Sequence, residues 1–269
     1  MTLAVTMHGA AGRMGRAIIG VLDESQDAAL RAAVEHAQAK CLGTDAHVLA
    51  GRAARGVVVG SDLAAALEGS HVVIDFSLPV ATESVVAACR AARVPLVLGT
   101  TGLGPEQKAA VQALARELPV VFAPNYSQGV TALFHLAKRA TELLGPAFQA
   151  EITEIHHRHK VDAPSGTAVR LAEVVAQAKG VELAEAGVYG REGQVGARTL
   201  DELGVFALRG GDVVGEHTLF LFGEGERIEI THRATDRTIF ARGAVRAATW
   251  VVGKPPGLYD MFDVMGVAR

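Results

Sequence analysis

A glycine-rich turn near the N-terminus narrows the possible folds more than any other part of the chain. Gly9, Gly12 and Gly15 follow an apolar run at residues 3–8 and open a segment of helical spacing at residues 13–22. Glycine lets the backbone turn sharply after a strand and approach a pyrophosphate, and a helix start offers N–H groups to the anion. The commoner G-x-G-x-x-G motif has glycine where this chain has Ala10. The turn therefore predicts a dinucleotide-binding unit, with these cofactor contacts: Gly9, Ala10, Ala11, Gly12, Arg13 and Met14.

An acidic residue downstream supports this interpretation. Glu35 lies 20 residues after Gly15 and directly follows a predicted second strand at residues 28–34. A carboxylate at this place can hold the ribose hydroxyls, and it repels a 2′-phosphate, which favours NADH. The neighbouring His36 could donate a hydrogen bond to such a phosphate. The alternative is a plain turn with an exposed glutamate, and the choice between NADH and NADPH stays open.

The first half of the chain alternates short apolar runs with helical patterns. Further strands are expected at residues 72–74, 96–98 and 120–122, with a short apolar run at 57–59, and helical segments at 62–67, 81–92 and 105–118. This rhythm predicts an α/β fold, a Rossmann-like doubly wound parallel sheet with helices on both faces. Ligands bind beyond the carboxyl ends of such strands. Two strand ends therefore add cofactor candidates, although each segment could be a plain turn: Gly99, Thr100 and Thr101, and Ala123, Pro124, Asn125 and Tyr126.

The second half of the chain has a different rhythm. Helices are expected at residues 130–144 and 167–179, a strand at 150–155, a hairpin at 218–222 and 227–232, and a final helix at 238–252. Antiparallel strands with helices on one face are typical of a separate α+β domain. The change of rhythm places the domain boundary near Ser127.

Charged and titratable side chains are most concentrated between Glu154 and Thr167. Three histidines, an arginine and a lysine crowd at positions 156–160, and the sequence Pro-Ser-Gly-Thr at positions 164–167 opens a helix. That helix start can bind an anion through backbone N–H groups and the hydroxyl of Ser165 or Thr167, so the cluster suits a small acidic substrate. A solvated basic loop is one alternative. A metal site on the histidines is another, but HExxH and its ligand spacing are absent.

Composition excludes several classes of partner. The net charge is -3 with no run of like charge, so neither nucleic acid nor an anionic membrane is indicated. The two cysteines, Cys41 and Cys89, form no CxxC and favour a reducing compartment. We read no signal peptide and no apolar run of membrane-spanning length, and we expect a cytoplasmic protein.

The stretch from His156 to Ala168, HHRHKVDAPSGTA, resembles the signature of the bacterial 4-hydroxy-tetrahydrodipicolinate reductases, also called dihydrodipicolinate reductases. The resemblance extends over nearly the whole chain. Its other segments are residues 9–16, 75–77, 99–102, 123–130, 191–193, 209–218 and 257–261. Two departures are His36, where some members carry arginine, and Thr131, where asparagine is commoner.

The resemblance implies roles for particular residues. His156 takes the place of the catalytic proton donor, and Lys160 that of a second catalytic residue that also holds a substrate carboxylate. His157, Gly166 and Thr167 match substrate-binding positions. The cofactor positions named above match those that bind NADH or NADPH. No metal is expected.

The resemblance also implies a domain plan and a reaction. Residues 1–127 with 237–269 would form the dinucleotide-binding domain, and 128–236 a substrate-binding domain that builds a homotetramer. The small dicarboxylate substrate would be reduced, with loss of water, to tetrahydrodipicolinate in the diaminopimelate route to lysine. The alternatives are another two-domain NAD(P)-dependent dehydrogenase of a small dicarboxylate, a metal hydrolase, or a dinucleotide-sensing regulator without activity.

Overall fold

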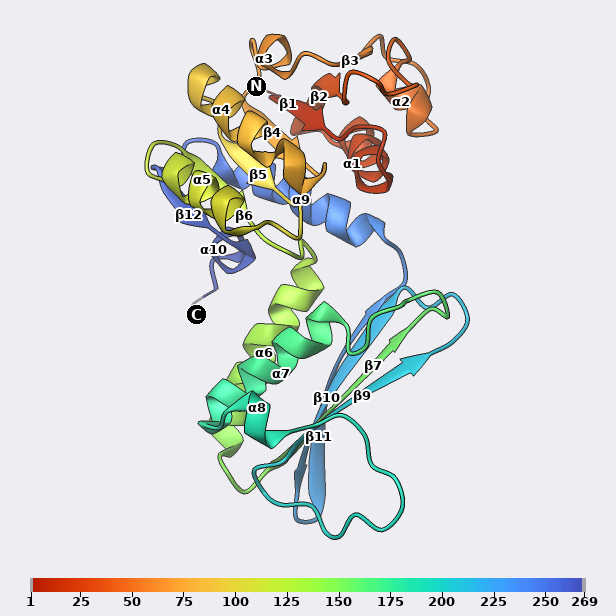
Figure 1. Ribbon diagram of the computed structural model, residues 1–269, viewed down its shortest axis with the longest axis vertical. Helices are drawn as coiled ribbons and strands as arrows, with labels where there is room; N and C mark the ends of the chain where they lie inside the picture. The colour runs from red at the N-terminus through yellow and green to blue at the C-terminus, as the bar shows by residue number, and fades with distance from the viewer. Residues whose placement is uncertain (1, 268–269) are drawn as a thin grey trace. The chain divides into compact units, whose positions relative to one another are not determined.

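The computed structural model describes residues 2–267, and these fall into two compact units (Figure 1). The first unit contains the chain up to residue 128 and the segment from residue 238 onward. The second unit comprises residues 129–237. The chain thus enters the second unit once and returns to complete the first.

The first unit is built on a seven-stranded sheet in which every strand pair is parallel. The strand order is β12-β6-β5-β4-β1-β2-β3. Strands β2 and β3 thus lie on one side of β1, and β4, β5, β6 and β12 lie on the other. The strands are β1 (Leu3–His8), β2 (Ala28–Val34), β3 (Val59–Gly60), β4 (Val72–Asp75), β5 (Leu96–Leu98), β6 (Pro119–Phe122) and β12 (Gly257–Tyr259). The expected Rossmann-like doubly wound sheet is therefore confirmed.

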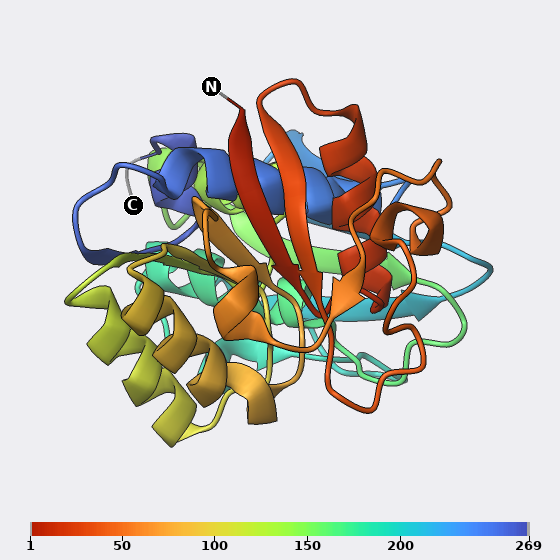
Figure 2. The same ribbon diagram turned by 90° about the horizontal axis from the view of Figure 1, so that it is seen from above.

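Helices cover both faces of this sheet, as Figure 2 shows. They are α1 (Arg13–Glu24), α2 (Ala46–Leu49), α3 (Leu63–Ala66), η1 (Pro79–Ala81), α4 (Thr82–Ala92), α5 (Pro105–Ala115), α9 (Thr238–Val251) and α10 (Met261–Met265). Strand side chains alternate between two apolar cores. On β4, Val72 and Ile74 join the core under α1 and α9, whereas Val73 joins the core under α4 and α5. Burial on both faces explains why these strands read as unbroken apolar runs.

The second unit is a five-stranded mixed sheet in the order β11-β10-β7-β9-β8. Its strands are β7 (Gln149–His156), β8 (Gly187–Val188), β9 (Leu203–Arg209), β10 (Gly215–Gly223) and β11 (Glu226–Ala234). The helices α6 (Gln128–Leu144), α7 (Gly166–Lys179) and α8 (Leu183–Ala186) lie on one side of the sheet (Figure 1). The hairpin of β10 and β11 around Gly223–Gly225 is confirmed.

Two sequence-based expectations were wrong. The helix at Thr238–Val251 is not the last element, because β12 and α10 follow it. The second sheet is not only antiparallel, because β9 pairs in parallel with both β7 and β8. β12 has three residues and β8 has two, so neither is long enough to show a periodic pattern.

Among the described residues, no helix combines the length and the apolar character that crossing a membrane requires.

Candidate functional site

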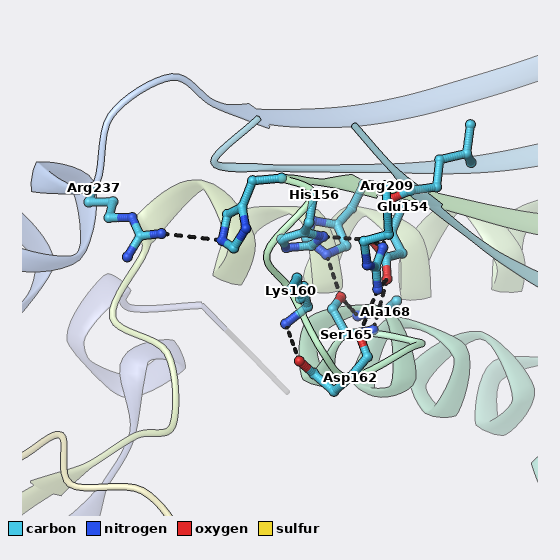
Figure 3. Close-up of polar contacts among 11 residues, drawn as sticks. Glu154, His156, Lys160, Asp162, Ser165, Ala168, Arg209 and Arg237 are labelled. Atoms are coloured by element: carbon cyan, nitrogen blue, oxygen red, sulfur yellow. Dashed lines mark hydrogen bonds and ion pairs between the residues drawn. The ribbon is translucent and has the colours of Figure 1, made fainter. Parts of the chain in front are cut away.

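The strand β7 carries Glu154 and His156 on one face of the second sheet, because side chains two residues apart point the same way. The side chain of Glu154 is fully buried and that of His156 is 12% exposed. The His156 Nδ1 atom lies 2.6 Å from Glu154 Oε2 (Figure 3). A histidine is thus held at the strand end by a carboxylate beneath it.

Glu154 accepts hydrogen bonds from three different elements. Arg209, at the end of β9, donates to both carboxylate oxygens at 2.8 and 2.9 Å. The parallel register of β7 and β9 pairs Arg209 with His156, which brings the guanidinium alongside. The backbone N–H of Ser165, just before α7, donates to Oε1 at 2.9 Å. This single carboxylate therefore connects β7, β9 and the start of α7.

These contacts determine the charge of Glu154. Burial by itself would raise the pKa of this carboxyl, but the hydrogen bonds from Arg209, His156 and the Ser165 N–H outweigh it and hold the pKa below its usual range. An ionised carboxylate can only accept, so Nδ1 of His156 is the protonated nitrogen. Nε2 has no hydrogen-bond partner among residues 2–267 and is the nitrogen free to exchange a proton with a ligand.

Lys160 lies in the turn after β7 and pairs with Asp162. Its Nζ is 2.9 Å from Asp162 Oδ1, and its side chain is 19% exposed. The hydrogen bond from Lys160 lowers the pKa of Asp162, which is 57% exposed. A substrate carboxylate could replace this exposed partner at little cost, because a solvated ion pair contributes only about 0–1 kcal/mol.

Ser165 is buried and caps α7, since its hydroxyl accepts a hydrogen bond from the Ala168 N–H at 3.2 Å. The same hydroxyl lies 3.0 Å from Nε2 of His217 on β10. Burial lowers the pKa of His217 to about 4, so its ring is neutral and can accept the hydroxyl proton. The Ser165 hydroxyl thus has two partners within the protein, and its role in binding an anion stays a prediction; Gly166, the next residue, is exposed.

The other two histidines of the basic cluster have partners of their own. The His157 N–H donates to Val213 O at 2.8 Å, and its Nε2 lies 3.4 Å from Arg237. Partial burial and the charge of Arg237 lower the pKa of His157. His159 is exposed and contacts Arg158. In the described part of the chain, no three His, Cys, Asp or Glu residues converge as metal ligands.

In the first unit, the glycine-rich turn has the close packing that its sequence predicts. Gly9 has φ +79°, and a Cβ on Gly15 would lie 2.2 Å from Gly9 O. Only glycine can occupy either position without moving the backbone. Gly12 is the N-cap of α1, so the first N–H groups of that helix face outward from the turn.

Two hollows flank this turn within the first unit and both include Gly12. One, of about 500 Å³, is lined by Gly9, Glu35 and His36 together with Phe76–Leu78. The other, of about 650 Å³, is lined by most of the remaining cofactor candidates: Arg13, Met14, Gly99, Thr100, Thr101, Pro124, Asn125 and Tyr126. Phe76, Ser77 and Leu78 line both hollows, which together form a groove across the carboxyl ends of the strands.

Some of the candidate cofactor-binding residues are buried or already bonded within the protein. Glu35 Oε1 accepts a hydrogen bond from the Ala11 N–H at 2.8 Å, so it already holds the turn. Ala10 and Ala123 are buried and line neither hollow. The Tyr126 hydroxyl is buried and donates to Leu98 O at 2.9 Å. Ala10 and Ala123 therefore shape the groove through packing and backbone position, whereas Glu35 and Tyr126 also belong to its lining.

Sequence reasoning gave no role to Glu154, Arg209, His217, Asp162 or the Phe76–Leu78 segment. The sequence could have pointed to Glu154, because it precedes His156 by two residues on a predicted strand and so lies on the same face. The sequence could also have pointed to Phe76–Leu78, because this segment follows β4 just as the other cofactor candidates follow β5 and β6. Arg209 and His217 come from strands whose register no local pattern reveals.

Comparison with known proteins finds relatives of both halves of the chain. The models of the dihydrodipicolinate reductase N-terminus and C-terminus match residues 3–126 and 129–265. The curated 4-hydroxy-tetrahydrodipicolinate reductases of Alkalilimnicola ehrlichii and Halorhodospira halophila are 53% and 52% identical, each over 99% of this chain and 100% of the relative.

Solved structures share the fold. A dipicolinate-bound dihydrodipicolinate reductase from Paenisporosarcina sp. TG-14 is similar with a TM-score of 0.79 at 24% identity, over 98% of this chain and 99% of that one. A myo-inositol dehydrogenase from Lactobacillus casei, in complex with NAD(H) and myo-inositol, reaches a TM-score of 0.59 at 17% identity, over 98% and 91% of the two chains. With both halves matched by the family models and full-length relatives at about 50% identity, the chain belongs to the dihydrodipicolinate reductase family.

Proposed function

We propose that this chain reduces 4-hydroxy-tetrahydrodipicolinate to tetrahydrodipicolinate with NADH or NADPH, in the diaminopimelate route to lysine. One hydride and one proton enter the ring and one water leaves. The full-length relatives that carry this activity in their names are the first support. The carboxylate-held histidine beside a lysine and a helix start is the observation within this molecule that carries the proposal.

The first unit fits a nicotinamide dinucleotide. The pyrophosphate would bind to the N–H groups at the start of α1, where Gly12 leaves room for it between the two hollows. Glu35 and His36 would face the adenosine ribose, and Thr100, Thr101, Asn125 and Tyr126 the nicotinamide half. When bound, the nicotinamide supplies the hydride.

The second unit fits a dianionic ring. We assign one substrate carboxylate to Lys160 and His157 and the other to the backbone of Gly166 and Thr167 at the start of α7. His156 supplies the proton through Nε2, while Glu154 fixes the ring and stabilises the imidazolium form. General acids of this kind contribute about 100- to 10,000-fold to rate.

A coupled assay tests the proposal. The substrate is generated by its upstream synthase, and the absorbance loss of NADH and NADPH is followed side by side, with a panel of other small dicarboxylates as controls. We expect turnover with the synthase product, and we propose that it persists after treatment with a chelator because no step needs a metal. Turnover confined to another dicarboxylate would refute the proposal.

Replacing Lys160 with alanine should raise KM for the dicarboxylate and lower kcat together. The ammonium is removed from one carboxylate, and a charge-assisted hydrogen bond contributes about 1.5–3 kcal/mol, which corresponds to roughly 10- to 150-fold in kcat/KM. Steady-state kinetics measures both constants. The matched control is Lys179→Ala, which removes a lysine at the far end of α7. Unchanged saturation by the dicarboxylate in Lys160→Ala would contradict the assigned contact.

We also propose that the chain works as a cytoplasmic homotetramer. The second sheet has helices on one side (Figure 1). The alternation of burial along β10 places Phe220 and Phe222 on the other side, where their ring centroids are 5.8 Å apart. Half-buried aromatic side chains on a sheet face that no helix covers favour association with further copies. Light scattering should give roughly four times the chain mass of 28.0 kDa, and Phe220→Glu should lower it whereas Phe220→Leu should not. A monomeric wild-type mass would contradict the proposal.

A further inference from the structure

A second carboxylate-held histidine lies in the first unit, outside the chemistry assigned above. His8, the last residue of β1, places Nδ1 2.5 Å from Oδ1 of Asp75, the last residue of β4. The parallel register pairs these two residues directly. The side chain of Asp75 is fully buried and that of His8 is 12% exposed.

The other oxygen of Asp75 is also satisfied. The Thr100 hydroxyl, after β5, donates to Oδ2 at 2.6 Å and accepts a hydrogen bond from the Ser77 N–H at 3.1 Å. In its contact with the Asp75 oxygen, Nδ1 of His8 is placed to donate. The network fixes the orientation of the imidazole from beneath and ties together the turns that follow β4 and β5.

The remaining nitrogen of His8 is left for a ligand. Its Nε2 has no partner among residues 2–267 and is not buried, and the side chain lines the hollow that also contains Glu35 and His36. A buried ring nitrogen needs a partner in the protein or an ordered water, whereas an accessible one can bind a ligand. Here one nitrogen is paired and the other faces the hollow.

We propose that His8, positioned by Asp75 and Thr100, binds the adenosine half of the dinucleotide through Nε2. The partner is an oxygen of the adenosine ribose or of its 5′-phosphate, which supplements Glu35 on the same wall. Asp75 acts through His8 and does not touch the ligand. This inference rests on the proposed cofactor but not on the identity of the dicarboxylate.

The test uses a variant that separates the two ring nitrogens. In His8→Asn the amide can still donate to Asp75 but no atom reaches the position of Nε2. We expect the Kd values of NADH and AMP to rise together by about 3- to 10-fold, as for loss of one hydrogen bond. Binding is measured by NADH fluorescence, with AMP as competitor. Adenosine, which lacks the phosphate, serves as a second competitor. Its affinity should fall in His8→Asn only if the ribose is the partner of His8.

The following outcomes decide whether the inference holds. Unchanged NADH and AMP affinity in His8→Asn would overturn the inference, and so would a loss for NADH without a loss for AMP. The effect of Asp75→Asn on AMP affinity should largely vanish in the His8→Asn background, because one contact cannot be lost twice. If the wild-type protein bound neither NADH nor NADPH, the proposed function would fail instead. An Asp75→Asn variant that does not fold leaves the His8→Asn result decisive.

Discussion

Replacing His156 with alanine is expected to lower kcat by at least about 100-fold while NADH affinity stays within about twofold of wild type. The imidazole is the group whose free Nε2 can deliver a proton, and its Nδ1 is held by an ionised carboxylate. None of the groove-lining residues of the first unit is altered by the substitution. Steady-state kinetics with saturating substrate gives kcat, and NADH fluorescence gives the dissociation constant.

His159→Ala is the matched control for this prediction. It removes an exposed imidazole from the same turn, three residues along the chain, without touching Glu154. We expect its kcat to stay within a few-fold of wild type. A His156→Ala enzyme that keeps its kcat would remove His156 from the chemistry, and equal losses in both variants would point to the charge of the turn as a whole.

The fold of the first unit could be predicted from the sequence because local signals agreed with one another. Val72–Ile74, Leu96–Leu98 and Val120–Phe122 are short β-branched or apolar runs, and all are buried strands. Each is preceded or followed by a helix of ordinary length, which requires parallel crossovers. The glycine positions then fix the first turn by sterics alone, as the contact between Gly15 and Gly9 shows.

The second unit was less predictable because its strands pair across long distances in the chain. β9 begins 47 residues after the end of β7 at His156, yet it pairs beside β7 in parallel. Buried and exposed side chains do not alternate regularly along β9, and the segment before it has little regular structure. No local sequence pattern indicates whether such a strand runs parallel or antiparallel to its neighbour.

The candidate site divides in the same way. His156, Lys160 and Gly166–Thr167 lie within 12 residues and were found together. Arg209 and His217 reach Glu154 and Ser165 only through the pairing of β9 and β10 with β7. The candidate ligand-binding groups could thus be proposed from the sequence, whereas the groups that contact and orient them required the three-dimensional register.

Glu154→Gln should lower kcat on the order of 100-fold or more and leave the affinity for NADH unchanged. The amide keeps the size of the side chain but removes the charge that orients and stabilises the His156 imidazolium. Steady-state kinetics across pH should also show a changed profile for kcat, which a merely structural role would not move. The control is Glu151→Gln on the opposite face of β7, where the carboxylate pairs with Arg191, and its kcat should be near wild type.

The stability of Glu154→Gln should depend on pH in a defined direction. Breaking one partner of a buried ion pair costs about 3–5 kcal/mol, because Arg209 then lacks its counter-charge. The pKa of Glu154 is lower in the folded protein than its ordinary value of 4.5, so the carboxylate stabilises the fold fully above that pH. The stabilisation is lost as pH falls through the folded pKa. Thermal unfolding should therefore show a gap in Tm between wild type and variant that is constant near neutral pH and narrows below about pH 4.5. A gap that widened on acidification would mean that Glu154 is protonated in the folded protein, and the proton-donor assignment of His156 would lose its basis.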